Sequence, residues 1–258
     1  MLGRTLKMAF WLFHDHLGSL VLSNLISAIA IALPLSFALP ALSSGDPYSI
    51  TAIALPLCSL AGFIVAPICA TAMAHMLKVF LDTRDGGIAD FFAGVRKHAL
   101  RAAGAGGLCG IGMTALLSSA WFYTTRMTSF PMLGYALAGL ALGSALVLTA
   151  VAVYIPPALV QRKTGVLQTI RLTLYLALAN PGLTAGLLLQ ILLVTALATL
   201  FWPLAFIGYL ASILCLTSAA YELLSRKYAA TAGEESPPDA MDDYLNRGLR
   251  DLFFPWKG

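Results

Sequence analysis

The positions of the basic side chains constrain the fold of this chain more than any other feature of its sequence. All 16 Lys and Arg residues except Arg126 lie in four segments: the N-terminus, Lys78 to Arg101, Arg162 to Arg171, and Arg226 onward. The segments between them are apolar and long enough to cross the hydrocarbon core of a bilayer, which is about 30 Å thick. Because Lys and Arg concentrate in cytoplasmic loops, this pattern predicts a multi-pass membrane protein with both termini in the cytoplasm.

The composition leads to the same expectation. Hydrophobic residues make up 59% of the chain and charged residues 11%, against about 45–50% and about 25% in soluble domains. A soluble chain of 258 residues could not cover that much apolar surface. The net charge of +4 does not indicate nucleic acid, because the cations lie beside the ends of apolar segments. We therefore expect a lipid bilayer around the protein and no nucleic-acid partner.

The hydropathy predicts an all-α, polytopic membrane bundle of six transmembrane helices within residues 1–228. The first apolar segment is longer than the core of a signal peptide, about 7–15 residues, so we interpret it as a retained span. We expect the protein in a bacterial inner (cytoplasmic) membrane. The six spans are expected at about residues 17–42, 50–80, 102–123, 132–160, 181–201 and 204–224.

Three amphipathic or basic segments precede helical hairpins, at Leu2–Leu17, Asp90–Arg101 and Gly165–Asn180. Two interpretations are open: short helices that lie at the cytoplasmic face of the membrane, or cytoplasmic ends of the spans themselves. In both, cations reach lipid phosphates while their aliphatic stems cover apolar surface. The cations expected at this cytoplasmic interface are Arg96, Lys97, Arg101, Arg162, Lys163 and Arg171.

Residues 229–240 have the composition of a linker, and residues 241–258 form an amphipathic C-terminal tail. Three acids balance three bases in the tail, so anionic lipid attracts it only weakly. We expect the tail to dock onto the cytoplasmic face of the protein or onto a partner; anchoring in the interface and disorder are the alternatives. The expected docking residues are Leu245, Leu249, Leu252, Phe253 and Trp256.

The sequence contains no recognisable set of catalytic or metal-binding residues. No Asp, Glu, Lys or Arg lies in the middle of a predicted span, which argues against ion coupling through an intramembrane charge, although a sodium site built from carbonyls stays open. His14 and His16 flank Asp15, but neighbouring residues on a helix point apart. No phosphate loop or zinc motif is present, and the four cysteines lack CxxC spacing. We predict no enzyme activity, no cofactor and no metal.

Two polar features lie at the inner ends of predicted spans. Glu222 and Arg226 are four residues apart, which predicts an ion pair at the end of a helix. His75 lies one turn before Lys78. It is interpreted either as a polar helix-end residue or as a contact to a lipid headgroup or a ligand phosphate.

Small residues recur every four positions within three predicted spans. Such stripes let helix backbones approach closely, which supplies packing energy where lipid removes the hydrophobic driving force. The alternative is that a stripe forms the face of a homo-oligomer. The expected packing residues are Gly62, Ala66, Ala70 and Ala74 in the second span, Gly106 and Gly110 in the third, and Gly139 and Gly143 in the fourth.

Prolines in the first two spans suggest a cavity. Kinked helices can frame such a space, and uncharged polar side chains would then line it. The residues assigned to this hypothetical cavity are Asn24, Pro34, Thr51, Pro56, Pro67 and Thr71.

Several stretches of the sequence together resemble a known family. They are Leu22-Ser-Asn-Leu-Ile-Ser with Leu33-Pro, Ala66-Pro-Ile-Cys-Ala-Thr-Ala-Met, Asp90-Phe-Phe-Ala-Gly-Val-Arg-Lys, Ile155-Pro-Pro-Ala-Leu-Val and Leu174-Tyr-Leu-Ala-Leu-Ala-Asn-Pro. On these landmarks, roughly residues 10–228 resemble the YesL-like family of bacterial six-span membrane proteins. The resemblance implies at most a role near carbohydrate uptake and supplies no catalytic residues.

Two functions from different classes fit these observations. The first is an accessory or scaffold protein whose spans and cytoplasmic elements contact a membrane-protein partner. The second is a solute-binding subunit or permease that uses the kinked first and second spans as a cavity wall. A filled interior would favour the scaffold, and a roomy polar pocket would favour the solute binder.

Overall fold

The computed structural model describes residues 1–127, 130–231 and 244–247, and the regular elements within them are all helical. Two short stretches of the second predicted span have π-helical geometry, η1 and η2. The elements are α1 (Leu2–Asp15), α2 (Leu17–Ser43), α3 (Pro47–Ser49), η1 (Ile50–Ala54), α4 (Leu55–Leu60), η2 (Ala61–Val65), α5 (Ala66–Thr83), α6 (Ile88–Arg126), α7 (Pro131–Gln161), α8 (Val166–Ala179), α9 (Pro181–Leu200), α10 (Pro203–Ile207) and α11 (Tyr209–Thr231).

Five helices in the described part of the chain are long and apolar enough to cross a membrane. This is the composition of a multi-pass membrane protein, as the hydropathy predicts. The five coincide with the first five predicted spans: Leu17–Ser43, Pro47–Thr83, Ile88–Arg126, Pro131–Gln161 and Pro181–Leu200.

The segment expected as a sixth span is interrupted. The short helix α10 ends at Ile207, Gly208 has φ −161° and ψ 9°, and α11 begins at Tyr209. Pro203 starts α10, where its fixed φ suits the first turn of a helix. The sequence prediction of one continuous helix over residues 204–224 therefore misses a break near its outer end.

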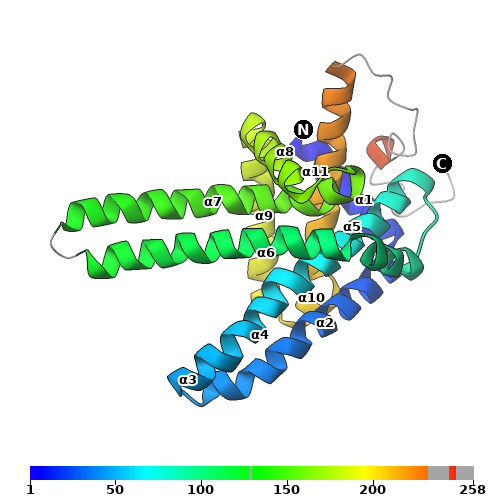
Figure 1. Cartoon of the computed structure of the whole chain (residues 1–258). Coiled ribbons are helices and arrows are strands. Elements are labelled where there is room, and N and C mark those ends of the chain that lie inside the picture. The colour runs from blue at the N-terminus through cyan, green and yellow to red at the C-terminus, as the bar shows by residue number, and fades with distance from the viewer. Residues whose placement is uncertain (128–129, 232–243, 248–258) are drawn as a thin grey trace.

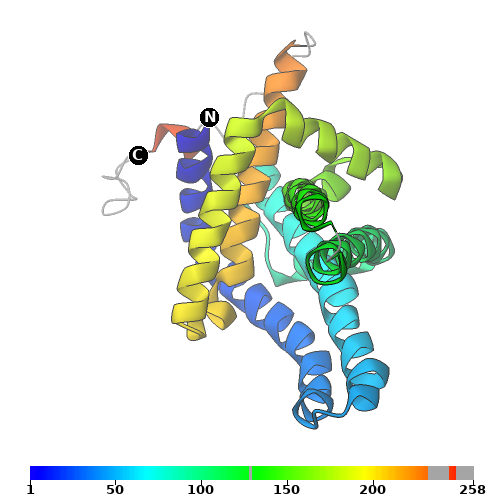
Figure 2. The same cartoon turned by 90° about the vertical axis from the view of Figure 1, so that its left-hand side faces the viewer.

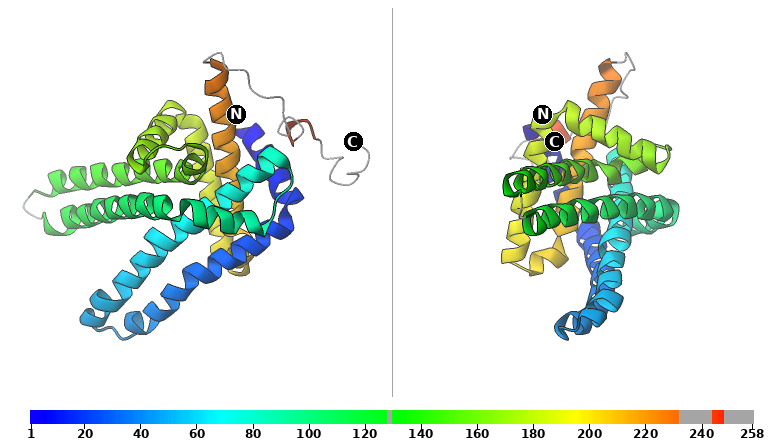
Figure 3. Two further views of the ribbon diagram at one scale, coloured as in Figure 1. Left: turned by 45° about the vertical axis from the view of Figure 1, so that its right-hand side comes forward. Right: turned by 60° about the vertical axis from the view of Figure 1, so that its left-hand side comes forward.

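The helices form three antiparallel hairpins whose tips diverge from a common end (Figures 1 and 3). The first hairpin is α2 with α3–α5, the second is α6 with α7, and the third is α9 with α10–α11; we call them arms one, two and three. Arm two runs across the direction of α9 and α11 in Figure 1 and is seen nearly end-on in Figure 2. We call the common end, where α1 and α8 also lie, the hub. The arrangement is more open than the single bundle that the sequence predicts.

The main hydrophobic core lies in the hub. Its largest fully buried side chains come from helices that are far apart in the sequence, including Met8 of α1, Phe80 of α5, Phe91 of α6, Tyr154 of α7 and Tyr221 of α11. Burial of each such side chain contributes about 1.5–3 kcal/mol. A smaller cluster joins α6, α7 and α8. The hub therefore holds the three arms together.

The arms themselves are sparsely packed. Only 17–28% of the most apolar window of each candidate span is buried inside the protein. Large apolar side chains such as Phe37, Ile111, Leu140 and Leu192 are each more than 60% exposed. Because apolar residues surround each arm, no single face directs the arms toward one another, and lipid is the environment that such surfaces require.

Each π-helical segment stands directly before a proline of arm one. The N–H of Leu55, the residue before Pro56, donates to the carbonyl of Ile50, and the N–H of Ala66, before Pro67, donates to Ala61. These bonds reach back five residues in place of four. The wider turns keep the backbone hydrogen-bonded next to prolines that lack an N–H.

The three amphipathic segments have two different outcomes. The first and third form separate helices, α1 and α8, whereas the second continues into α6 without a break. The start of α6 is capped by Asp90, whose carboxylate accepts a hydrogen bond from the N–H of Gly87 at 2.9 Å. No helix-breaking residue follows before the apolar segment, so the helix runs on from hub to tip.

Candidate functional site

The hub contains one buried carboxylate among the described residues, Glu222 of α11, which is 7% exposed. Its Oε2 accepts hydrogen bonds from Lys78 Nζ of α5 at 3.2 Å and from Gln161 Nε2 of α7 at 3.0 Å. Arg226, one turn along α11, lies 3.5 Å from Oε1, which confirms the predicted helix-end pair. Lys78 also pairs with Asp82 at 2.8 Å. One carboxylate thus ties three helices together.

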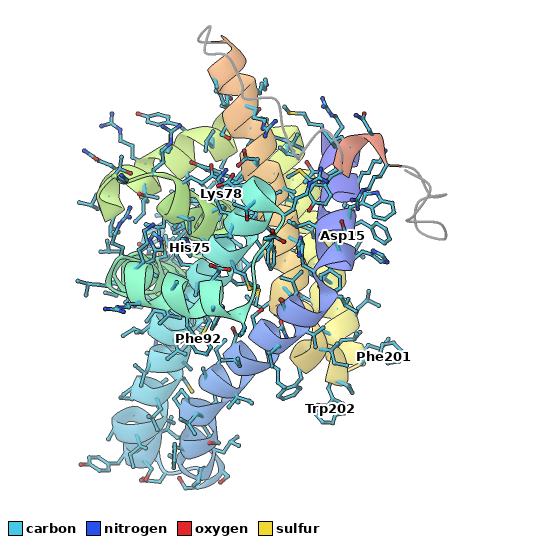
Figure 4. The ribbon with its side chains drawn as sticks, turned by 90° about the vertical axis from the view of Figure 1, so that its right-hand side faces the viewer. Asp15, His75, Lys78, Phe92, Phe201 and Trp202 are labelled. Atoms are coloured by element: carbon cyan, nitrogen blue, oxygen red, sulfur yellow. The ribbon has the colours of Figure 1, made fainter. Side chains whose placement is uncertain are left out.

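A pair of histidines lies where α5 meets α6. The rings of His75 and His98 are 5.2 Å apart between centroids, and His98 is only 4% exposed. Both ring nitrogens of His98 and Nδ1 of His75 have no hydrogen-bond partner in the described structure. Figure 4 shows His75 in the hub with Lys78 on the same helix. His75 therefore contacts another helix, although the sequence suggested a free helix end.

These histidines do not make a metal centre within the described residues. No group of three or more His, Cys, Asp or Glu side chains there could hold a metal ion. The four cysteines are free thiols on apolar arms or in the core. The two imidazole rings form a contact between α5 and α6. Gly94, where an added Cβ would lie 2.9 Å from the His75 Cβ and from Ala72, allows that close approach.

Asn24 of α2 is the most heavily hydrogen-bonded side chain of the arms. Its Nδ2 donates to the carbonyls of Ala205 at 3.0 Å and Phe206 at 2.6 Å. Its Oδ1 accepts from the N–H groups of Leu210 at 2.8 Å and Ala211 at 3.2 Å. The amide therefore uses its full hydrogen-bonding capacity.

These four bonds cover the break in the third arm. Leu210 and Ala211 are the second and third residues of α11, whose N–H groups an N-capping side chain usually satisfies. Gly208, before α11, has no side chain to do so. Asn24 supplies this cap from another helix and also satisfies two carbonyls at the end of α10. Asn24, which the sequence assigned to a cavity wall, thus makes a contact between helices in the structure.

A groove of about 350 Å³ opens between α5, α6 and α7. Its lining is apolar apart from the side chain of Thr71 and the thiol of Cys109, and Pro67 is the other member of the predicted cavity set that lines it. The groove is framed by the second, third and fourth apolar segments, whereas the predicted cavity was placed between segments one and two.

The remaining residues of the predicted cavity lie elsewhere. Pro34 is buried within α2, whereas Pro56 is exposed on arm one. The Thr51 hydroxyl is exposed and donates within its own turn, to the carbonyl of Pro47 at 2.8 Å. Their sequence pattern carried no information on which neighbouring helix each would meet.

The small residues of α5 and α6 do pack closely. A Cβ added at Gly106 would lie 2.3 Å from Pro67 Cγ and 2.4 Å from the Phe63 carbonyl oxygen, and one at Gly110 would lie 2.3 Å from the Phe63 ring. Only glycine fits these two positions. Gly62, Ala66 and Ala70 line the adjacent groove, and Ala74 is buried.

The stripe predicted on α7 faces away from α6. A Cβ at Gly139 or Gly143 would meet nothing within 4 Å, and both residues are exposed. In the half of α7 nearer the tip, the buried residues are Gly134, Ala138, Ala141 and Ala145. Within the described part of the chain, no helix therefore packs against Gly139 or Gly143 closely enough to require a glycine.

The cations predicted at the cytoplasmic interface all lie at or near the hub, and some of them form hydrogen bonds there. The Arg101 guanidinium donates to the carbonyls of Arg162, at 2.9 Å, and Thr164, which holds the connection from α7 to α8. Arg171 donates to the Tyr175 hydroxyl at 3.2 Å. The exposed members of the set are Arg96, Lys97, Arg162, Lys163 and Arg171.

The described turn of the tail, residues 244–247, docks on the hub. Leu245 packs against the main core, and its carbonyl accepts a hydrogen bond from Lys7 Nζ at 2.6 Å. Arg247 forms an ion pair with Asp15 of α1. For this turn, the chain provides its own docking surface. Leu249, Leu252, Phe253 and Trp256 lie outside the described residues.

Comparison of this chain with known protein families, with curated proteins and with solved structures finds no match. The arrangement of contacts therefore has to be interpreted on its own chemistry. That chemistry is structural in character: one carboxylate network, one amide cap and one glycine-mediated helix contact.

Proposed function

We propose that this chain is a six-span protein of a bacterial inner membrane that serves as an accessory or scaffold subunit. In this proposal the hub and both termini lie on the cytoplasmic side, and the tips of the three arms lie on the outer side. The arms contact lipid and the helices of a membrane-protein partner or a second copy of the chain.

The charge distribution supports this orientation. Among the described residues, Arg126 is the one cation at a tip, while the other tips carry Asp46 and the aromatic pair Phe201 and Trp202 (Figure 4). Lys and Arg at the hub follow the positive-inside rule, and Trp suits the level of the headgroups. The start of α9 and the end of α11 lie at the same end of the third arm (Figure 2). This arrangement is required if α10 and α11 together make a sixth crossing of the membrane.

The exposure of the arms is the observation that carries the scaffold assignment. At most 28% of any candidate span window is buried by the chain itself. Diverging arms leave long apolar surfaces between them, which other transmembrane helices can fill by close packing. A subunit that worked alone around a central site would be expected to bury more of its own spans.

The chemistry of the groove disfavours the solute-binding alternative. A hydrophilic solute such as a carbohydrate needs several convergent hydrogen-bonding groups, because burying its hydroxyls without partners is costly. Thr71 is the one hydroxyl in the lining of this groove, and Asn24 is fully engaged at the α10–α11 break. The groove therefore suits an apolar group.

We also propose membership of the YesL-like family, on the sequence landmarks quoted above, and with it a place near carbohydrate uptake. Four landmark residues have defined structural contacts that would explain a pattern without catalytic groups. Asn24 caps α11, Pro67 packs on Gly106, Asp90 caps α6, and Asn180 donates to the Tyr228 hydroxyl at 2.9 Å.

Cysteine labelling tests the orientation. In a variant without the natural cysteines, Ser43→Cys places a thiol at the tip of arm one and Lys163→Cys places one on the hub. A membrane-impermeant maleimide should label Ser43→Cys in intact spheroplasts and Lys163→Cys only after permeabilisation. Labelling of Lys163→Cys in intact spheroplasts would overturn the proposed orientation.

Photo-crosslinking in cells tests the scaffold role. A photoreactive residue at Leu140 or Leu192, which are 69% and 64% exposed, should yield discrete protein adducts. Ala145, buried within arm two, is the matched control and should yield none. An adduct of twice the mass of the chain would identify a second copy as the partner. Failure of every exposed position on the three arms to capture protein would refute the scaffold role.

A further inference from the structure

A second pocket, of about 270 Å³, lies in the hub between α8 and α11. Side chains such as Leu176 and Tyr175 line it from α8, and Tyr221 and Tyr228 line it from α11. Arg162, from the connection between α7 and α8, is the one charged residue in its lining. The pocket therefore combines an apolar wall with tyrosine rings and a cation.

Two tyrosines of the pocket also contact cations outside its lining, one on α8 and one on α11. Arg171 Nε and Nη2 each donate to the Tyr175 hydroxyl at 3.2 Å. Lys227 Nζ lies 5.6 Å from the centre of the Tyr228 ring, within the range of a cation–π contact. Positive charge thus flanks the pocket from α8 and from α11.

No carboxylate offsets this charge within the pocket. Neither Asp nor Glu belongs to its lining. Glu222, next to Tyr221, turns its carboxylate to Lys78, Gln161 and Arg226 inside the hub. The described lining of the pocket therefore carries one cation, Arg162, and no carboxylate next to an apolar interior.

We propose that this pocket binds one anionic phospholipid. An acyl chain lies along the leucine and tyrosine wall, and the phosphate group is held by Arg162 and Arg171. Basic pockets between membrane helices recognise anionic headgroups in this way. Inorganic phosphate would leave the apolar wall empty, and a neutral lipid would bring no negative charge to Arg162 and Arg171.

The size of the pocket fits part of a lipid. Its volume of about 270 Å³ is just below the range of whole-ligand pockets, about 300–1,000 Å³. The rest of the lipid would stay in the bilayer beside α8, where Leu167 and Leu178 are 72% and 60% exposed. The inference requires the arms to lie in a membrane. It depends neither on the side that the hub faces nor on the scaffold role.

Native mass spectrometry of the full chain in a neutral detergent tests the proposal. Phosphatidylglycerol, phosphatidylcholine and inorganic phosphate are titrated separately. We expect one molecule of phosphatidylglycerol to be retained at least tenfold more tightly than phosphatidylcholine. One basic residue near a headgroup contributes about fivefold in affinity, so the double variant Arg162→Gln/Arg171→Gln should weaken phosphatidylglycerol binding about 10–30-fold.

Two further variants make the test specific. Arg96→Gln removes an exposed hub cation that does not line the pocket and should change binding less than twofold. Ala179→Trp fills the pocket from an exposed lining position and keeps every cation. It should abolish the retention of phosphatidylglycerol, and it provides the test if the double variant fails to fold. Equal binding of both lipids, equal effects of Arg96→Gln and the double variant, or competition by inorganic phosphate alone would overturn the proposal.

Discussion

Replacement of Asn24 by alanine should destabilise the protein by removing the cap between the first and third arms. All four hydrogen bonds of the amide end on backbone groups around the α10–α11 break. Interhelical hydrogen bonds in membrane proteins contribute about 0.6 kcal/mol each on average, so four amount to about 2.4 kcal/mol. Because Asn24 is 1% exposed, unpaired backbone groups would raise the cost further. We expect a loss of about 2–4 kcal/mol in the free energy of unfolding.

The measurement is unfolding of the purified protein by SDS titration in mixed micelles, followed by circular dichroism. Ser23→Ala is the matched control, since Ser23 is also buried on α2 but donates only within its own helix, to the carbonyl of Leu20 at 3.0 Å. Its replacement should cost less than about 1 kcal/mol. Asn24→Asp can accept from both N–H groups but cannot donate to the carbonyls, so its stability should also fall below that of the unsubstituted protein. Equal stabilities of Asn24→Ala and Ser23→Ala would refute the capping argument.

Three further predictions concern the α5–α6 contact, the buried carboxylate and the α1–α2 corner. Gly106→Ala should destabilise by about 1–3 kcal/mol through overpacking, whereas Gly139→Ala should be neutral or stabilise by up to about 1 kcal/mol, both measured by the same SDS titration. Lys78→Met should cost about 1–3 kcal/mol by leaving Glu222 short of a partner, and adding Glu222→Gln should recover part of that loss. Burial lowers the pKa of His16 below its ordinary value of 6.5, against an opposing effect of Asp15, so thermal stability should fall as the pH drops below about 6.5.

The sign of the pH effect follows from the proton affinity of the two states. The unfolded chain binds a proton on His16 near pH 6.5, while the folded chain binds it only at lower pH. The contribution of His16 to the free energy of unfolding is thus fully present above pH 6.5 and is lost as the pH falls towards the pKa of the folded state. His16 stacks on Phe80 with ring centroids 3.8 Å apart, so His16→Phe should keep the contact and flatten the dependence. A steeper decline of stability with falling pH in His16→Phe would contradict this reasoning. Equal losses of stability in Gly106→Ala and Gly139→Ala would contradict the overpacking argument. A double Lys78→Met/Glu222→Gln variant less stable than Lys78→Met would contradict the argument about the buried carboxylate.

The limits of the apolar helices could be predicted closely from the sequence. The first, fourth and fifth predicted segments, 17–42, 132–160 and 181–201, match helices at Leu17–Ser43, Pro131–Gln161 and Pro181–Leu200. Apolar composition defines each segment, and a proline at the first helical position marks the start of the last two, at Pro131 and Pro181. The third segment was predicted to begin at 102, but its helix begins at Ile88, because no helix-breaking residue separates the basic segment from the apolar one.

Contacts between distant segments could not be predicted in the same way. Glu222 was correctly paired with Arg226, four residues away, since the helix repeat brings these two together. Its partners Lys78 and Gln161 are 144 and 61 residues away, and nothing in the periodicity of any helix specifies such a pairing. Asn24 was identified as a polar residue with a role. Its true partner is a helix break, for which Gly208 was the available signal.

The open arrangement of the arms has a similar cause. A soluble helix has one apolar face, and that face tells which side packs inward. The arms are apolar on every side, so their sequence specifies burial in lipid without specifying a neighbouring helix. Where small residues permit a close approach, as at Gly106 and Gly110, the contact is determined. Elsewhere the arms diverge from the hub.

The exposed glycines of α7 allow the scaffold proposal to be tested against stability. A Cβ added at Gly139 or Gly143 meets no described atom within 4 Å, so Gly139→Leu/Gly143→Leu should leave SDS resistance unchanged or slightly higher. If a partner helix packs on this face, the same change should abolish adducts captured from the neighbouring position Leu140, because leucine side chains keep two backbones apart. Thr149→Leu, exposed on α7 but on the side of the helix opposite Leu140, is the control and should preserve the adducts. Adducts from Leu140 that persist in the double variant would show that the stripe faces only lipid.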